Sequence, residues 1–158
     1  SCCLSRCRHN FPYLDETYHN PIHSMKTVAP TAADIENLAM QAFDALPDVL
    51  RAEVGEIVFR VEEYPDQEII RSMELQSRLE LLGLYQGIDL LDKSVSDPLP
   101  DVDMIFLYQR PLLDYWSETG ETMECRVRHV LIHEIGHHFG FSDDDMKALE
   151  AGAEALGE

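Results

Sequence analysis

The chain has 158 residues and a formal net charge of −18, from 30 acidic and 12 basic residues. This length suits one domain with a single core, and so strong a negative charge makes nucleic acid and anionic membranes poor partners. No apolar run approaches the roughly 20 residues of a membrane-spanning helix, and the four cysteines form no disulfide framework, so we expect a protein of the reducing cytoplasm.

We predict a single domain over residues 27–158, and the first 26 residues differ from it. They have no periodic apolar pattern and no apolar stretch typical of a secretory signal, so we expect a disordered tail. Three of the four cysteines lie there, close to His9. Their spacing is not that of a zinc finger, and a second metal site in the tail is kept as an alternative.

Apolar spacing and end signals place the elements in the first half of the domain. A helix is predicted after Thr31, which suits an N-cap, and it ends before Pro47. Alternating apolar residues over 55–64 predict a strand. The spacing over 66–82 predicts a second helix.

The second half of the domain continues with shorter elements. Residues 83–87 are β-like, 94–100 form a loop rich in Ser, Asp and Pro, and 102–109 are a strong strand candidate. A helix over 121–139 follows, because its apolar residues recur at spacings of three and four. The order of elements predicts an α+β domain with helices packed on a small mixed β-sheet.

This last helix carries the pattern His-Glu-x-x-His. Four residues apart on a helix, His133 and His137 stand one turn apart on one face. Two imidazole nitrogens can then bind one Zn²⁺ at roughly 2.0–2.1 Å. Glu134 is close to the metal but turned away from direct coordination, where it can accept a proton from a water at the ion.

A catalytic zinc site usually has three protein ligands and one open position. Gly140 is well placed to end the helix in a left-handed turn, which lets the chain reverse. Asp143, ten residues after His133, is then the expected third ligand. Asp144, Asp145 or a residue elsewhere in the chain are the alternatives.

The run from His133 to Asp143 resembles the metzincin pattern HExxHxxGxxH with its last histidine replaced by aspartate. The longer segment 130–146 is similar to the small bacterial zincin-like metallopeptidases, and segments 81–87 and 105–109 also look like that family. The resemblance covers roughly residues 31–149. It implies that His133, His137 and Asp143 bind zinc and that Glu134 is the catalytic base.

Larger metzincins have a methionine turn well downstream of the zinc helix. Here only Met146 is available, and we expect it to be ordinary core. The resemblance also implies an extended substrate that adds as a strand to a sheet edge, and we expect this edge near Phe106.

We therefore predict a zinc-dependent peptidase that hydrolyses peptide bonds, with Zn²⁺ as cofactor and a peptide or protein as substrate. A zinc-binding protein with little or no proteolytic activity is one alternative, and a metallohydrolase of a non-peptide amide or ester is the other. Glu134 argues against the first, because a purely structural zinc site needs no base.

For several other polar and aromatic side chains, a role in a substrate cleft beside the metal and a purely structural role are both open. Arg126 and His129 share the helix face of the predicted ligands, so they are candidates for a contact with substrate or with a carboxylate behind the metal. The alternative is a solvated polar face. Tyr108, Tyr115 and Trp116 are candidates for lining the cleft, with core packing as the alternative.

Overall fold

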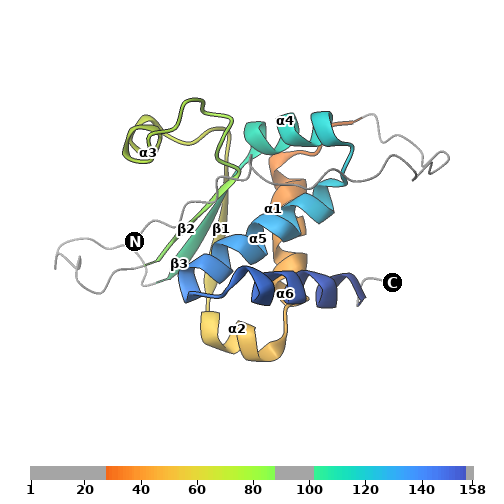
Figure 1. Ribbon diagram of the computed structural model, residues 1–158. Coiled ribbons are helices and arrows are strands. Elements are labelled where there is room, and N and C mark those ends of the chain that lie inside the picture. Colours follow the sequence, from red (N-terminus) through yellow and green to blue (C-terminus); the bar gives the residue numbers. More distant parts are fainter. Residues whose placement is uncertain (1–27, 88–101, 156–158) are drawn as a thin grey trace.

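The computed structural model describes residues 28–87 and 102–155 (Figure 1). The predicted tail over 1–26 and the predicted loop over 94–100 lie outside these residues. Among the helices of these described residues, none combines the length and the hydropathy needed to cross a bilayer.

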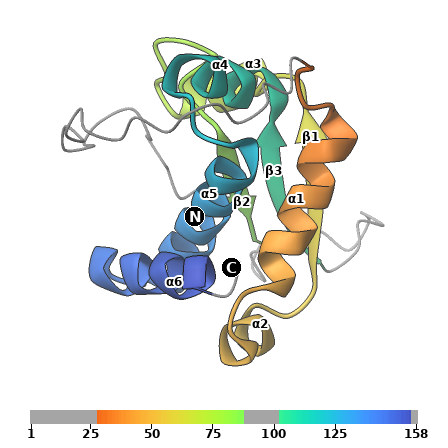
Figure 2. The same ribbon diagram turned by 90° about the vertical axis from the view of Figure 1, so that its right-hand side faces the viewer.

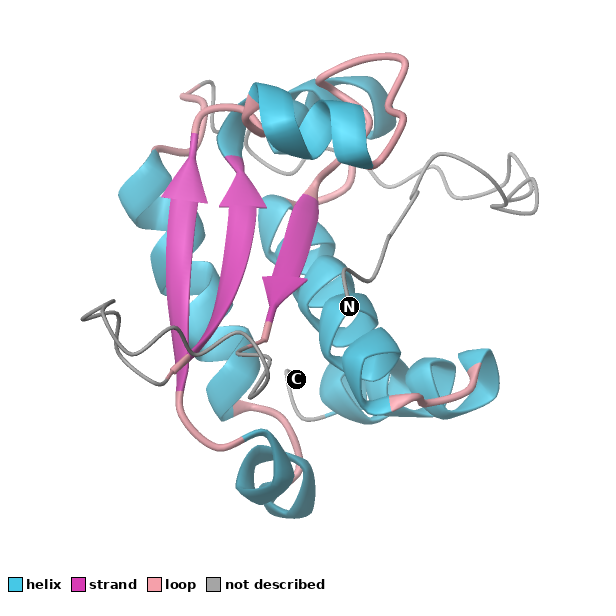
Figure 3. Ribbon diagram, turned by 90° about the vertical axis from the view of Figure 1, so that its left-hand side faces the viewer, coloured by secondary structure: helices cyan, strands magenta, loops and turns pink. Residues whose placement is uncertain are grey.

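Three strands form one mixed sheet in the order β1-β3-β2 (Figure 3). The central strand β3 (Asp103–Tyr108) pairs in parallel with β1 (Ile57–Glu62) and antiparallel with β2 (Gly83–Gln86). The predicted α+β class with a small mixed sheet is confirmed.

The prediction that a sheet edge lies near Phe106 is wrong. Phe106 pairs with Arg60 of β1 on one side and with Leu84 of β2 on the other. Its strand therefore has no free edge at this residue. The edge strand nearest to the His-Glu-x-x-His helix is β2.

Two long helices cover one face of the sheet, α1 (Ala32–Asp44) and α5 (Met123–Phe139) (Figures 2 and 3). α1 begins as predicted at Thr31, whose side chain accepts from the N–H of Asp34 while the Asp34 carboxylate accepts from the N–H of Thr31. These reciprocal bonds satisfy N–H groups that the first helical turn leaves without partners.

The structure differs from the sequence prediction in three helices. α3 (Gln67–Ser72) is much shorter than the helix predicted over 66–82, because the chain turns at Glu74, whose φ of 52° is left-handed and incompatible with a continuing helix. The short α2 (Asp48–Val54) directly after Pro47, and α4 (Gln109–Thr119), were not predicted.

α5 ends as predicted at Gly140, which adopts a left-handed φ of 72°. After this turn α6 (Asp143–Ala155) runs back along α5 (Figure 1). The two helices approach closely at Gly136, where an added Cβ would lie 2.5 Å from the Sδ of Met146. Met146 is 1 % exposed and belongs to the main core, so it is a packing residue, as predicted.

The main core lies between the sheet and the helices α1 and α5, and α2, α4 and α6 add buried residues at its margins. A second, smaller cluster lies on the opposite face of the sheet and contains Tyr108, Leu84, Leu81 and Met73. Because α5 is in contact with α1, β2, α4 and α6, its polar residues are held between well-packed neighbours.

Candidate metal centre

Helix α5 presents three histidines in a stripe. His129, His133 and His137 follow one another at intervals of four residues, so they stand on one face of the helix. The ring centres of His129 and His133 are 4.2 Å apart, and those of His133 and His137 are 5.8 Å apart. The predicted pair His133 and His137 therefore lies side by side in the structure.

Helix α6 brings a carboxylate to this stripe. The Oε1 atom of Glu150 is 2.6 Å from the Nδ1 of His129 and 3.6 Å from the Nε2 of His133. The ligand atoms of these three residues lie within 4.8 Å of one another, so they form a candidate metal-binding group. Glu150 was not predicted from the sequence, because only the antiparallel packing of α6 on α5 brings it to the histidines.

The Glu150 carboxylate is partly buried, with a side chain that is 25 % exposed. Its Oε1 atom is fully buried, and the Nδ1 of His129 lies 2.6 Å from it. A buried carboxylate oxygen that faces two imidazoles can serve as a donor to a cation.

Burial lowers the pKa of His133 to about 4, and the neighbouring His129 and His137 act in the same direction. His133 is therefore neutral near pH 7, which is the form that binds a metal. Burial alone would raise the pKa of Glu150, but the contact with His129 and the charge of Arg126 lower it, so Glu150 is an anion.

Glu134 faces β2 rather than α6. It is fully buried, and its Oε2 atom accepts a hydrogen bond of 3.0 Å from the backbone N–H of Tyr85. Tyr85 is held in turn by its hydroxyl, which donates to Asp103 at 2.5 Å, and by its ring, which stacks on His138 at 4.0 Å. The edge strand thus fixes the carboxylate next to the histidine stripe.

Asp143 is the first residue of α6, and its side chain is exposed, like those of Asp144 and Asp145. The charge of Asp143 raises the pKa of His133, which places the carboxylate in its vicinity. Asp145 instead forms reciprocal hydrogen bonds with Ser142 at the start of α6. It therefore acts as part of a helix cap.

Arg126 lies on the same helix, but its side chain is buried against neighbouring residues of the protein. It is 1 % exposed, forms a 2.5 Å ion pair with Glu121 and lies 3.8 Å from the ring centre of Tyr115. Tyr108 lies in the second core cluster, and Trp116 packs against the main core. These contacts favour packing over substrate binding for the three aromatic residues.

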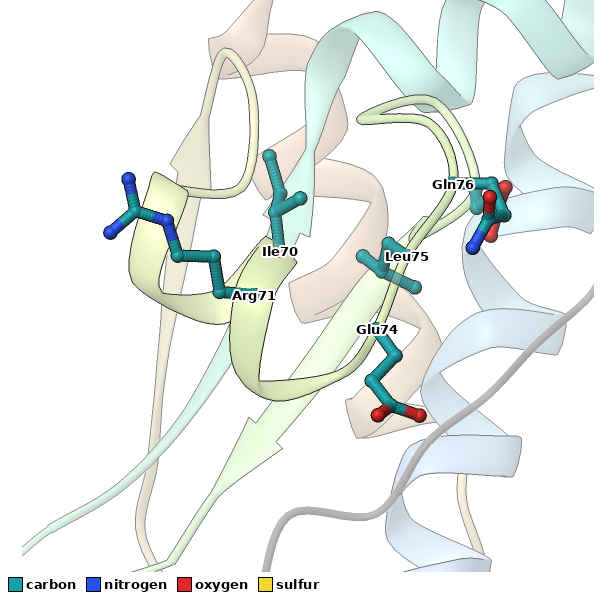
Figure 4. Close-up of a pocket in the computed structure, with 6 residues that line it drawn as sticks. Ile70, Arg71, Glu74, Leu75 and Gln76 are labelled. Carbon is teal, nitrogen blue, oxygen red and sulfur yellow. The ribbon is translucent and has the colours of Figure 1, made fainter.

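A cavity of about 520 Å³ lies elsewhere, beside α3 (Figure 4). Its lining contains none of the residues of the His-Glu-x-x-His motif; it is formed by Ile70, Arg71, Glu74, Leu75, Gln76 and Glu80. The chemistry suggested by the motif therefore has to be sought on α5 and its neighbours β2 and α6.

The histidine stripe has a spacing that suits zinc. Two imidazoles on one tetrahedral zinc place their ring centres about 5 Å apart, since each metal–nitrogen bond is about 2.0–2.1 Å long. The 5.8 Å separation of His133 and His137 is close to this value. Neutral imidazole and carboxylate are also the donors that catalytic zinc sites use.

The profile of the zincin-like metallopeptidase family matches residues 54–153, which include all of α5 and the segment of α6 that carries Glu150. Because the match covers more than half of the chain, the protein belongs to the zincin-like metallopeptidase family. No curated protein matches the chain significantly. The family implies a metal, and the described residues offer donors for it.

Proposed function

We propose that the protein is a zinc-dependent peptidase that hydrolyses peptide bonds at α5. The observation that supports this most strongly is the placement of Glu134, a fully buried carboxylate one residue after His133 and bound to the backbone of β2. Burying a carboxylate costs free energy, so a fully buried one beside the histidines is better explained by a role in the site than by packing. Membership of a metallopeptidase family supports the same reaction.

In this proposal His133 and His137 are two of the zinc ligands, and a carboxylate of α6 is the third. The sequence predicts Asp143 for this role, and that prediction is kept as a candidate. When bound, zinc lowers the pKa of a water molecule toward neutrality and polarises a substrate carbonyl.

Glu134 acts as the general base and then as the general acid. It accepts the proton of the attacking water and delivers it to the leaving amine. The hydrogen bond from the N–H of Tyr85 to Oε2 fixes the plane of the carboxylate, which keeps its orientation constant during the two proton transfers.

The substrate we propose is a neutral or cationic peptide. The net charge of −18 disfavours an acidic substrate. The two alternatives are a zinc protein without proteolysis and a hydrolase of a non-peptide amide or ester. A cleavage assay with peptides and with small amides and esters distinguishes them from the proposal.

The purified chain is incubated with a peptide library and with a panel of small amides and esters. Each incubation is run with zinc, with a chelator, and with zinc restored after chelation. We expect peptide cleavage that the chelator abolishes and zinc restores. Cleavage of the small amides or esters alone would favour the metallohydrolase, and tight zinc binding with no turnover would favour the binding protein.

A further inference from the structure

One histidine of α5, His138, places its ring against the edge strand β2. It follows Glu134 by four residues, so the two side chains leave the helix on the same face. The ring centre of His138 lies 4.0 Å from that of Tyr85, and the two ring planes are inclined by only 18°. This stack joins the last turn of α5 to the strand whose backbone binds Glu134.

The chain directly after β2 leaves room for the stack because Gly87 has no side chain. An added Cβ at Gly87 would lie 2.8 Å from Cε1 of His138, closer than two carbon atoms approach without a bond. The imidazole of His138 therefore lies against the backbone at Gly87 as well as against the ring of Tyr85.

Tyr85 is the residue through which His138 reaches Glu134. Its side chain is 1 % exposed, its backbone N–H donates to Glu134 Oε2 at 3.0 Å, and its hydroxyl donates to Asp103 at 2.5 Å. The strand that carries it has only four residues and one neighbouring strand. The position of β2 relative to α5 therefore depends on contacts such as the stack with His138.

We propose that His138 is a positioning residue for Glu134: its ring holds Tyr85, and the N–H of Tyr85 holds the carboxylate in the orientation that proton transfer needs. This inference rests on the proposed function, because it takes Glu134 as the base. The faces of the two rings carry the contact, so a flat ring is required at this position and a ring nitrogen is not. Loss of the ring lets β2 move, and a misplacement of about 1 Å in an active site can cost about 100-fold in rate.

The first test compares peptide hydrolysis by the full-length parent, His138→Ala and His138→Phe, with the zinc content of each protein determined. His138 is exposed, so both variants should fold. We expect His138→Ala to lower kcat by about 10-fold or more, with KM within about 2-fold of the parent and about one zinc per chain. His138→Phe restores a flat ring and should stay within about 3-fold of the parent.

Three results would overturn the proposal. A His138→Ala protein with the kcat of the parent would show that the stack does not matter for the reaction. A His138→Phe protein as slow as His138→Ala would show that the imidazole nitrogens are needed. Loss of zinc in His138→Ala would make His138 part of the metal centre.

The second test asks whether His138 acts through Glu134. When His138→Ala is added to Glu134→Gln, kcat should fall by less than about 2-fold, because the base whose orientation it controls is already absent. A further loss as large as in the parent background would mean that His138 acts independently, against the proposal. A slow Glu134→Gln with a fast His138→Ala would refute this inference alone, whereas a fast Glu134→Gln would refute the proposed function.

Hydrogen exchange of the Tyr85 amide, followed by NMR, reports the contact without turnover. We expect this exchange to be about 10-fold faster in His138→Ala, with the amide of Ile105 in the central strand unchanged. Gly87→Ala, whose methyl group would meet the ring of His138, should accelerate the same amide, and the matched control Gly152→Ala should not. Unchanged exchange of the Tyr85 amide in either His138→Ala or Gly87→Ala would contradict the proposal.

Discussion

Gly83 at the start of β2 has almost no free space around its Cα, and replacing it with alanine should loosen the site. An added Cβ would lie 2.6 Å from Cγ1 of Val130 on α5 and 3.1 Å from the backbone oxygen of Phe106. Neither neighbour can move easily, because Val130 is fully buried and the oxygen belongs to the central strand. The strand β2 therefore has to shift away from α5.

The expected cost follows from two opposing effects. Overpacking of a core costs about 1–3 kcal/mol. Replacing glycine by alanine in a strand recovers about 0.5–1 kcal/mol of chain entropy. We expect Gly83→Ala to lower the free energy of unfolding by about 1–2 kcal/mol, which lowers Tm by about 3–8 °C for a domain of this size.

Urea unfolding and thermal melts followed by circular dichroism measure this loss. Gly152→Ala is the matched control, because Gly152 is exposed in α6 and an added Cβ would meet nothing within 4 Å. We expect this control to stabilise the protein by about 0.5–1 kcal/mol.

A double mutant tests the contact itself. Val130→Ala removes the Cγ1 atom that the new methyl group would meet, so Gly83→Ala with Val130→Ala should cost about 1 kcal/mol less than the sum of the two single changes. Strict additivity, or a Gly83→Ala protein as stable as the parent, would refute the argument that β2 and α5 are in tight contact here. The same shift should reduce hydrolysis, because the N–H that holds Glu134 belongs to Tyr85, two residues along β2.

Three further changes test the packing and the charges. Met146→Ala should lower the free energy of unfolding by about 2–5 kcal/mol, measured in urea, because the side chain is fully buried between α5 and α6. Thr31→Ala should cost about 1 kcal/mol by removing the cap of α1, and a change below the error of the melt would contradict the capping role. The metal-free protein should lose stability as the pH falls from about 6.5 to 4, by about 3 kcal/mol at most. The pKa of His133 is about 4 in the folded protein and 6.5 in a flexible chain. The unfolded chain therefore binds more protons than the folded protein in this range. The lowered pKa of Glu150 acts in the same direction at lower pH, and His133→Gln should flatten the dependence in urea titrations at pH 7 and pH 5.

The elements that could be predicted from the sequence are those with a local signal. The cap at Thr31 and the left-handed Gly140 each satisfy backbone groups within one turn, so a few neighbouring residues are enough to predict them. The strand around Phe106 was also predicted, because it is a continuous apolar run.

The elements that were missed depend on contacts between distant residues. α4 begins at Gln109 directly after β3, and no turn residue separates the two. The helix predicted over 66–82 is interrupted at Glu74, a residue that gives no sign of a turn in the sequence. Strand order cannot be read from apolar alternation, which is why the sheet edge was expected at β3 instead of β2.

In the candidate site, too, the local features could be predicted from the sequence and the contacts between distant residues could not. His133, Glu134 and His137 are neighbours on one helix, so their spacing alone predicts that they act together. The bond between Glu134 and the N–H of Tyr85 joins residues 49 positions apart, and Glu150 reaches the histidines only through the packing of α6. No local pattern signals either contact.

The central claim is that Glu134 is the base of a zinc peptidase, and one comparison tests it most directly. The peptide hydrolysis rates of the parent and of Glu134→Gln are measured with the zinc content of each sample determined by elemental analysis. We expect about one zinc per chain in both proteins, since Glu134 is not a ligand, and a rate lower by about 100-fold or more in Glu134→Gln. Equal rates at equal zinc content would contradict the claim.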